Sequence, residues 1–309
     1  MSFAALQAGD LIGVLAPAGP VDADKLPAVL ALYERWGERY GYRTRLYPSC
    51  RANTGYLAGP DAMRLADLHA ALADDEVAAI HCLRGGYGTM RLLPDIDTAL
   101  LLRHPKLLMG YSDITALHAL WALHGLPSLH APMPASDLIK PGREADEAAL
   151  LQLLQRGLKA GDVLAPALQA GAPCVGGQAE GLLVGGNLSL VAALLGTPWA
   201  WNMQGAILFL EDVNEELFRV DRLLTQLRLA GVLDAVAGIV LGSFTEEASP
   251  TALLQDMLVP VCQQHGKPLL GGWPTGHGTP NRPMPMGLRV RLDATAGSLK
   301  LLQSLLHAK

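Results

Sequence analysis

The feature that most constrains the fold is the alternation of short apolar runs with helical segments in the first half of the chain. Residues 10–16, 77–83 and 107–109 have the length and composition of buried strands, whereas 26–40 and 61–73 carry apolar residues at helical intervals. Strands separated by helices pair in parallel, and ligand sites of such sheets lie at the carboxyl ends of the strands. The sequence therefore predicts an α/β domain with a parallel sheet, in which residues 42–47 form an edge strand.

A second pattern of strands and helices begins at Gly176, after a stretch from 132 to 173 that proline and glycine interrupt. We expect strands at 181–187, 206–210 and 236–241, and helices at 145–154, 188–195, 220–229 and 251–264. Two domains follow from this organisation. Residues 1–165 form an N-terminal α/β domain with its linker, and residues 176–309 form a smaller C-terminal domain.

Composition narrows the class of protein. The 309 residues are 50% hydrophobic and 17% charged and include 33 glycines and 21 prolines, which is typical of a compact, loop-rich α/β enzyme. The net charge of −5, without a basic stripe, argues against a nucleic-acid partner. Neither a signal-peptide pattern nor an apolar run of about 18 residues is present, so we expect no membrane partner. Four cysteines, far apart and without a C-x-x-C pair, indicate reduced thiols in the cytoplasm.

The segment 107–123 has the order of a nucleophile elbow. An apolar strand is followed by Gly110-Tyr111-Ser112-Asp113 and then by a helical stretch from Ala116, which would hold the Ser112 hydroxyl at the end of a sheet. The helix N-terminus behind the serine favours developing negative charge. Ile114 replaces the second glycine of the G-x-S-x-G pattern. The alternative is that Ser112 only caps the helix, since serine is a favoured N-cap residue.

A glycine-rich loop, Arg84-Gly85-Gly86-Tyr87-Gly88, follows the strand at 77–83. No G-K-[ST] follows it, so it is not a phosphate loop. Because neighbouring parallel strands end at one edge of a sheet, we expect this loop beside Ser112. The backbone amides of Gly86 and Asp113 would then form an oxyanion hole, although a plain tight turn remains the alternative.

A serine nucleophile needs a base, and nine histidines are available. His277 has the strongest context, because glycines at 276 and 278 and prolines at 274 and 280 build a rigid loop around it. His130, in a loop before Ala131-Pro132, is the other histidine that packing does not readily explain. The remaining seven lie in helices, in a strand or in a connector.

The third member of a triad is a carboxylate that orients the imidazole. Glu211 directly follows five apolar residues, so we expect it at the carboxyl end of a strand; Asp212, Glu215 and Glu216 are alternatives nearby. Strand alternation places Glu211 and Asp212 on opposite sides without choosing between them. No H-x-x-x-H or H-E-x-x-H occurs, so we predict neither a metal nor another cofactor.

Six motifs occur in order along the chain: residues 11–20, 84–88, 110–115, 185–187, 210–212 and 276–278. In this order and spacing they resemble the LD-carboxypeptidase family, the cytoplasmic muramoyltetrapeptide carboxypeptidases. The resemblance covers the chain from residue 11 to about 292 and is far more specific than any one motif.

The resemblance implies a serine peptidase with a Ser–Glu–His triad that removes the terminal D-alanine from a murein tetrapeptide during peptidoglycan recycling. By position, Ser112 is the nucleophile, Glu211 the orienting acid and His277 the base. Family members are typically homodimers with an N-terminal α/β domain and a mainly β C-terminal domain, whereas periodicity here indicates more helix. We add three candidates for substrate contact: Arg84 as a nearby positive charge, Gly85 and Asn187.

Two other functions remain open. A microcin C immunity-type peptidase would cleave an acyl-amide bond in a peptide–nucleotide conjugate and would use aromatic side chains near the cleft, for which Trp199, Trp201 and Trp273 are candidates. A non-enzymatic binding domain would use the same cleft and would tolerate replacement of Ser112.

Overall fold

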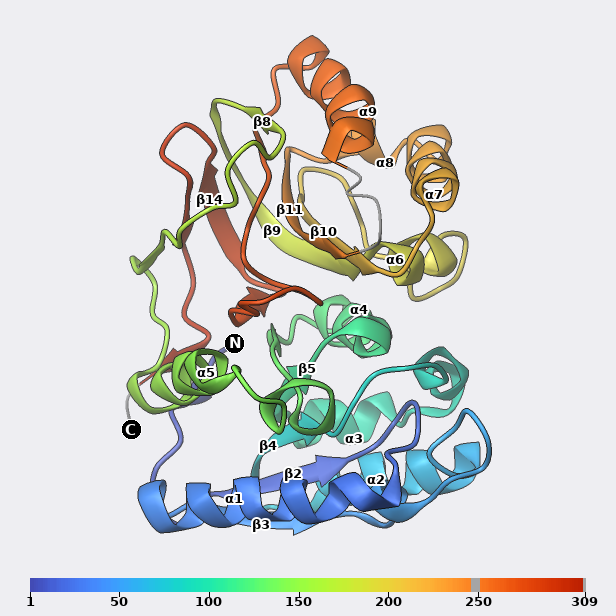
Figure 1. Cartoon of the computed structure of the whole chain (residues 1–309), viewed down its shortest axis with the longest axis vertical. Helices are drawn as coiled ribbons and strands as arrows, with labels where there is room; N and C mark the ends of the chain where they lie inside the picture. Colours follow the sequence, from blue (N-terminus) through green and yellow to red (C-terminus); the bar gives the residue numbers. More distant parts are fainter. Residues whose placement is uncertain (246–250, 308–309) are drawn as a thin grey trace.

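The computed structural model describes residues 1–245 and 251–307, arranged as two sheets stacked one above the other along the long axis (Figure 1). The lower part, blue to green except for the red strand β13, holds a six-stranded sheet in the order β13-β6-β5-β4-β2-β3. The upper, yellow-to-red part holds an eight-stranded sheet in the order β7-β15-β14-β9-β10-β11-β12-β8. The predicted α/β class with a second, sheet-rich domain is therefore confirmed.

Five strands of the first sheet are parallel, as expected: β2 (Leu11–Leu15), β3 (Arg43–Leu46), β4 (Val77–Cys82), β5 (Leu107–Gly110) and β6 (Ser128–His130). β3 lies at the edge of the sheet, also as expected. The helices of this region are α1 (Leu26–Tyr40), α2 (Asp61–Ala73), α3 (Thr98–Arg103), α4 (Thr115–Leu123) and α5 (Glu144–Arg156).

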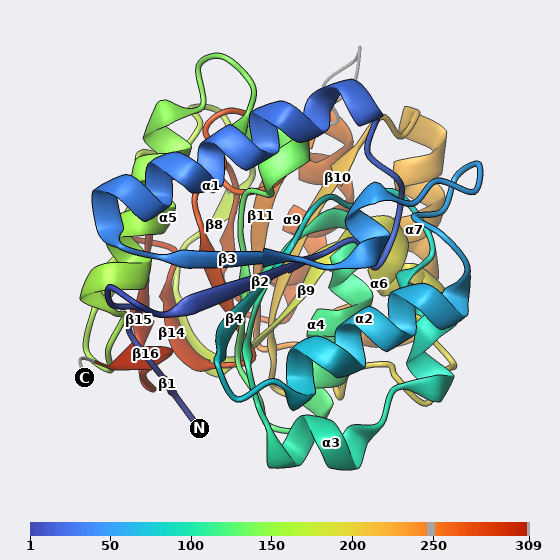
Figure 2. The same ribbon diagram turned by 90° about the horizontal axis from the view of Figure 1, so that it is seen from below.

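Alternating strand residues bury against opposite helical layers of the first sheet. Ile12 and Val14 belong to the core beneath α1 and α5, whereas Leu11 and Leu15 belong to the core beneath α2, α3 and α4. Figure 2 shows these two helical layers on either side of β2, β3 and β4. A sheet covered on both faces explains why its strands read as continuous apolar runs.

The second sheet has a parallel centre and antiparallel margins. Its parallel strands are β9 (Gln178–Asn187), β10 (Ile207–Val213), β11 (Gly238–Thr245) and β12 (Leu269–Leu270). Antiparallel pairing adds β14 (Arg289–Asp293), β15 (Ser298–Leu301), β7 (Val163–Leu164) and β8 (Cys174–Val175). One face packs against α6 (Leu188–Leu194), α7 (Leu217–Leu229), α8 (Val232–Ala235) and α9 (Thr251–Gln264). This half therefore contains both the sheet that the family resemblance implies and the helices that periodicity indicates.

The two halves exchange strands, so no single chain position separates them. β13 (Met284–Met286) comes from the second half but pairs antiparallel with β6 of the first sheet. β7, which lies inside the predicted N-terminal domain and linker, pairs with β15 of the second sheet. The boundaries 1–165 and 176–309 stay a prediction, and residue 309 lies outside the described residues.

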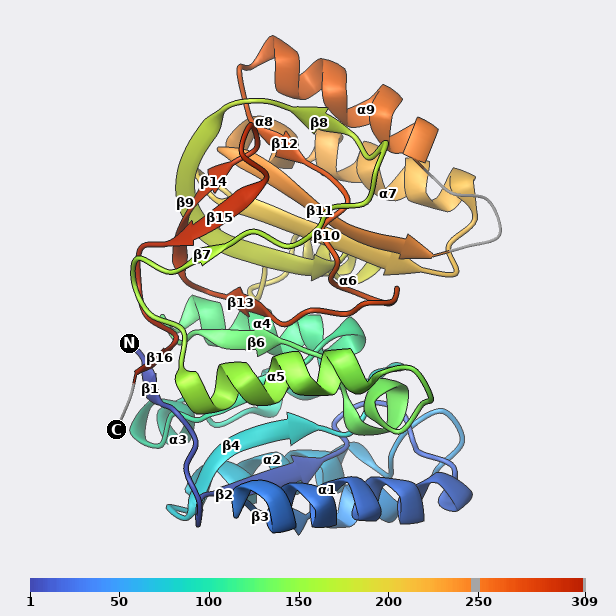
Figure 3. The ribbon, with the colours of Figure 1, turned by 60° about the vertical axis from the view of Figure 1, so that its left-hand side comes forward.

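Short elements complete the chain. β1 (Phe3–Ala4) pairs with β16 (Leu306–His307), so these first and last strands of the chain lie side by side (Figure 3). Short turns of 3-10 helix lie at Ala23–Lys25 (η1), Pro48–Arg51 (η2), Thr89–Asp95 (η3) and Ser112–Ile114 (η4), and a π-helical turn lies at Pro134–Leu138 (η5). Within residues 1–245 and 251–307, no helix has both the length and the apolar character to cross a membrane.

Candidate active site

Ser112 lies in a strained turn between β5 and α4. Its φ is +65°, a left-handed backbone conformation that non-glycine residues adopt rarely and that is characteristic of functional sites. Gly110, with φ +153°, passes so close to β4 that a Cβ would stand 3.0 Å from the Cβ of Cys82. Strand, turn and helix thus form the predicted elbow. The Ser112 hydroxyl makes no bond to a helix amide in the described part of the chain, so the capping alternative finds no support.

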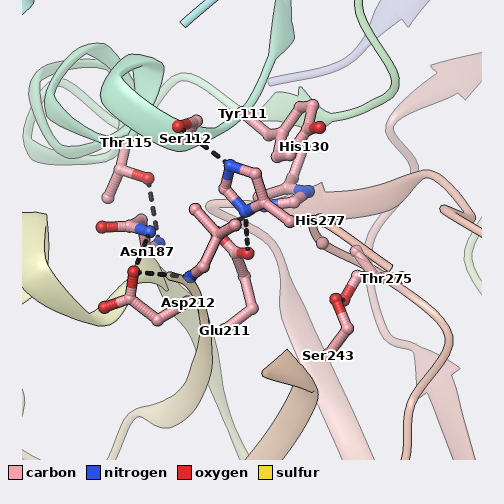
Figure 4. A network of polar contacts seen from close by, with 12 residues as sticks. Tyr111, Ser112, Thr115, His130, Asn187, Glu211, Asp212, Ser243, Thr275 and His277 are labelled. Carbon is pink, nitrogen blue, oxygen red and sulfur yellow. Dashed lines mark hydrogen bonds and ion pairs between the residues drawn. The ribbon is translucent and has the colours of Figure 1, made fainter. Parts of the chain in front are cut away.

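The structure brings Ser112, His277 and Glu211 into one linear array (Figure 4). The Ser112 hydroxyl is 3.1 Å from Nε2 of His277, and Nδ1 of His277 is 2.7 Å from Oε2 of Glu211. Ser112 comes from the first sheet, Glu211 lies in β10 of the second, and His277 stands on the loop that follows β12. This is the geometry of a nucleophile, a base and an orienting acid.

The loop that carries His277 is fixed by side chains that the sequence analysis did not select. The Ser243 hydroxyl accepts a hydrogen bond from the Gly278 amide at 2.8 Å, and the Asn281 side-chain oxygen accepts one from the Gly276 amide at 3.0 Å. Gly276 has φ +118°, and a Cβ there would stand 2.7 Å from Oε2 of Glu211. Only glycine therefore lets the loop lie against the glutamate.

The two neighbouring acids of β10 differ in environment. Burial alone would raise the pKa of Glu211, but the adjacent His277 and His130 together outweigh it and lower that pKa to about 2. Burial and the nearby Glu211 charge raise the pKa of Asp212, although Asp212 accepts hydrogen bonds from Asn187 and Ser189. The lowered pKa favours the ionised form of Glu211, which accepts the hydrogen bond from His277; Asp212 instead accepts hydrogen bonds at the start of α6.

The charge of Glu211 also acts on the base. Burial lowers the pKa of His277, but the Glu211 carboxylate bonded at Nδ1, together with the nearby Asp137 and Asp212, more than compensates, so the pKa lies above the ordinary histidine value. The imidazole thus becomes a stronger proton acceptor than a free histidine.

The glycine loop lies directly beside Ser112, because β4 and β5 are neighbours in the sheet. A Cβ on Gly85 would stand 3.0 Å from the Ser112 hydroxyl and 3.4 Å from the Asp113 amide nitrogen. Within the described residues, neither the Gly86 amide nor the Asp113 amide has a hydrogen-bond acceptor. Two unpaired N–H groups close to a nucleophile suit an oxyanion hole, and their assignment to that role stays a prediction.

A cavity of about 510 Å³ opens in front of Ser112 and His277. Its lining includes four basic side chains, Lys25, Arg84, Lys140 and Arg143, and two acidic ones, Asp22 and Asp137. Gly85 and Gly86 also line it, in agreement with the expected placement of the loop. The cavity is therefore positively charged on balance.

Asn187 does not line this cavity. Its side-chain nitrogen donates to Oδ1 of Asp212 at 2.8 Å, and its side-chain oxygen accepts from the Leu190 amide at 3.2 Å, capping α6. Its backbone amide donates to the Thr115 hydroxyl at 3.1 Å, a bond between the two halves of the chain. The structure thus gives this residue a structural position instead of the expected contact with substrate.

The tryptophans considered for nucleobase stacking are also elsewhere. Trp201 and Trp273 are buried, with 7% and 2% of their surface exposed, and Trp199 is partly buried against the core. None of the three lines the cavity at Ser112. Within the part of the chain that the structure describes, no group of three or more His, Cys, Asp or Glu residues has the arrangement of a metal site.

Comparison with known proteins identifies the class. Residues 12–131 match the LD-carboxypeptidase N-terminal domain, and residues 180–292 match the LD-carboxypeptidase C-terminal domain. The fold and these matches define a peptidase whose site lies between two sheets. The chain belongs to the LD-carboxypeptidase family.

Relatives along nearly the whole chain agree. A "Probable murein peptide carboxypeptidase" of Bacillus subtilis is 38% identical over 94% of this chain and 90% of its own length. A "Murein tetrapeptide carboxypeptidase" of Pseudomonas aeruginosa is 35% identical over 91% of this chain and 92% of its own.

Solved structures confirm the fold. The muramoyltetrapeptide carboxypeptidase from Oxalobacter formigenes superposes with a TM-score of 0.81 at 29% identity, covering 97% of this chain and 100% of that one. MccF, in a complex with glutamyl sulfamoyl guanosine, superposes with a TM-score of 0.86 at 22% identity, covering 99% of both chains. At that identity, the second likeness establishes the fold alone.

Proposed function

We propose that this protein is a serine-type LD-carboxypeptidase that removes the terminal D-alanine from a murein tetrapeptide by cleaving the bond after an L-configured centre. The observation that carries the proposal is the array of Ser112, His277 and Glu211, with the serine held in a left-handed turn. The relatives named as murein peptide and murein tetrapeptide carboxypeptidases support the choice of substrate.

In this mechanism the Ser112 oxygen attacks the peptide carbonyl while Nε2 of His277 takes the hydroxyl proton. Glu211 stabilises the imidazolium, and the amides of Gly86 and Asp113 stabilise the negative oxygen of the tetrahedral intermediate. His277 then returns the proton to the nitrogen of the departing D-alanine, which leaves an acyl-enzyme. Water, activated by the same histidine, hydrolyses the ester and restores Ser112.

The charge of the cavity supports a substrate rich in carboxylates. A carboxypeptidase must bind the free carboxylate of the departing residue close to the oxyanion hole, and guanidinium groups suit that task. Arg84 lines the cavity, uses one nitrogen to donate to the Pro20 carbonyl at 2.8 Å, and has a buried Nε without a partner among the described residues. Arg84 is therefore our candidate for this carboxylate.

The immunity-type alternative has less support from the site. Among the described residues that line the cavity, Tyr111 is the one Phe, Tyr or Trp, and it is 2% exposed; the only other ring is the imidazole of His277, which the triad uses. A nucleobase would lack a stacking partner there. The likeness to MccF thus favours a shared fold over a shared substrate.

Release of free D-alanine from murein tetrapeptide and from the corresponding pentapeptide tests the proposal. We expect turnover of the tetrapeptide and little of the pentapeptide. Comparable rates on both peptides would remove the carboxypeptidase assignment. Cleavage of an aminoacyl sulfamoyl nucleoside without D-alanine release would favour the immunity-type function, and absence of turnover on all three would favour a binding domain.

Chelation and assembly provide two further tests. We expect full activity in EDTA, because the proposed nucleophile and base are side chains; loss of activity that zinc restores would contradict a serine mechanism. We also propose a cytoplasmic homodimer, in line with the family. The four cysteines are free thiols, three of them buried, which suits a reducing compartment. Light scattering on the purified protein and fractionation of its host would check both points.

A further inference from the structure

Glu211 uses only one of its two carboxylate oxygens in the array. Oε2 accepts the hydrogen bond from His277, whereas Oε1 is buried and has no hydrogen-bond partner among the described residues. The glutamate is 0% exposed. A buried ionised oxygen without a donor is rare in folded proteins, because it has lost its water without replacement.

His130, at the end of β6, stands opposite this oxygen. It is 0% exposed, and neither of its ring nitrogens has a hydrogen-bond partner among the described residues. Nε2 lies 3.8 Å from Oε1 of Glu211. That separation is too long for a hydrogen bond and too short for a bridging water, which would need about 4.5–5.5 Å.

Within residues 1–245 and 251–307, no acceptor lies within hydrogen-bond distance of either ring nitrogen of His130. The rings packed against it belong to Tyr111, His118 and Phe209. The Tyr111 hydroxyl donates to Asp137, and both nitrogens of His118 are engaged, with the Ser128 hydroxyl and the Gly110 carbonyl. Figure 4 shows His130 beside His277, on the other side of that ring from Ser112. The unpaired imidazole and the unpaired carboxylate oxygen therefore face each other.

We infer that His130 is a positioning residue of the triad: with a proton on Nε2, it donates a hydrogen bond to Oε1 of Glu211 when the site is engaged. Catalytic hydrogen bonds that are long in a free enzyme commonly shorten in the reacting complex. Glu211 is then held between two imidazoles, and its carboxylate cannot rotate away from His277. The inference rests on the serine mechanism proposed above.

Kinetics of three variants separate positioning from packing. His130→Leu removes the donor, and we expect kcat to fall about 10- to 100-fold with KM unchanged within about twofold. His130→Gln can place a side-chain N–H near Oε1 and should retain kcat within about fivefold of wild type.

His81→Leu is the matched control. His81 is also 0% exposed, but its nitrogens contact Tyr33 and the Pro132 carbonyl instead of Glu211. It should lower the melting temperature and leave kcat nearly unchanged. A wild-type kcat in His130→Leu, or an equal loss of kcat in His81→Leu, would overturn the inference.

Nitrogen-15 NMR of histidine-labelled full-length protein tests the contact without relying on turnover. We expect Nε2 of His130 to carry a proton, and we expect Glu211→Gln to shift its Nε2 resonance. Measurement before and after a fluorophosphonate has reacted with Ser112 follows the contact into the engaged site. If Nε2 of His130 carries no proton either before or after reaction with the fluorophosphonate, the inference is overturned even if Ser112 proves essential. Conversely, an active Ser112→Ala variant would refute the triad while leaving the tautomer result standing.

Discussion

The ends of β5 and β10 present their polar residues in opposite ways. β5 delivers a neutral hydroxyl, and its position depends on backbone conformation: Ser112 has φ +65° and is preceded by Gly110. β10 delivers a charged side chain, Glu211, at the point where its pairing with β11 shifts register. The ionisation of this side chain depends on its neighbours, since His277 and His130 together lower the pKa of Glu211 to about 2 despite burial.

The difference separates two requirements of one reaction. The nucleophile must be placed accurately, and a strained turn does this locally. The acid must stay ionised in a dry environment, and only groups brought in from elsewhere in the chain can do this. Variants at each end should therefore fail in different ways.

Loss of the hydroxyl itself should have the largest effect. Ser112→Ala should lower kcat by about 10⁴-fold or more with the fold intact, because the variant retains the cavity and the amides but has no nucleophile. D-Alanine release and circular dichroism measure the two quantities. Retention of a tenth of wild-type turnover would exclude Ser112 as the nucleophile.

Removal of the Glu211 charge should have the second largest effect on kcat. Glu211→Gln keeps the shape but not the charge that stabilises the imidazolium, so we expect kcat to fall by about 10³- to 10⁴-fold. Glu216→Gln serves as the control, because that side chain is 68% exposed and pairs with Arg219 at the surface. Activity in the Glu211 variant similar to that of the control would show that the acid has been misassigned.

The pH profile should report the coupling between the two ends. His277 must be neutral to accept the Ser112 proton, and the pKa of this histidine is raised by Glu211. As pH falls through that pKa, kcat/KM should drop by about tenfold per pH unit, at a pH above the ordinary histidine range. In Glu211→Gln the acid limb of the remaining kcat/KM profile should lie at a lower pH than in wild type. An unshifted limb would show that Glu211 does not act on the base.

The smallest effect is expected at Asp212. Asp212→Asn should cost about tenfold or less in kcat and lower the stability by about 1–3 kcal/mol, because buried hydrogen bonds from Asn187 and Ser189 are lost. Thermal unfolding together with kinetics gives both values. A loss of activity larger than that of Glu211→Gln would reverse the assignment of the two neighbouring acids.

Much of the first half of the site is predictable from sequence because it is local. Strand, turn and helix around Ser112 lie within about 17 consecutive residues, and the glycine loop ends the neighbouring strand. The helices at 26–40 and 61–73 agree with their predicted bounds, since amphipathic periodicity defines them. α7 begins at Leu217, three residues before the expected start, because its first apolar residues, Leu217 and Phe218, are exposed and do not mark the buried face.

The other half depends on contacts between distant residues. Ser243 and Asn281 hold the His277 loop, and Asn281 in turn is held by Asp146, 135 residues away. Nothing in the local sequence of Asn187 distinguishes a helix cap from a residue that contacts substrate. For the same reason the sequence singles out His130 as a second histidine that packing does not explain but does not show its partner; the structure places its Nε2 3.8 Å from Oε1 of Glu211.

The pairing of β13 with β6 has a consequence for how the enzyme could be divided. Met284, seven positions after His277, is bonded in register to His130, and His130 is in register with Gly110 of the elbow strand. The segment that follows the base and the strand that precedes the nucleophile thus belong to one sheet, so the two catalytic groups do not lie on two separately folded domains. A chimaera that exchanged everything after residue 176 with a relative would replace an edge strand of the nucleophile's own sheet. If the enzyme were produced as two fragments divided at this point, its activity would return only after β13 of the second fragment had paired with β6 of the first.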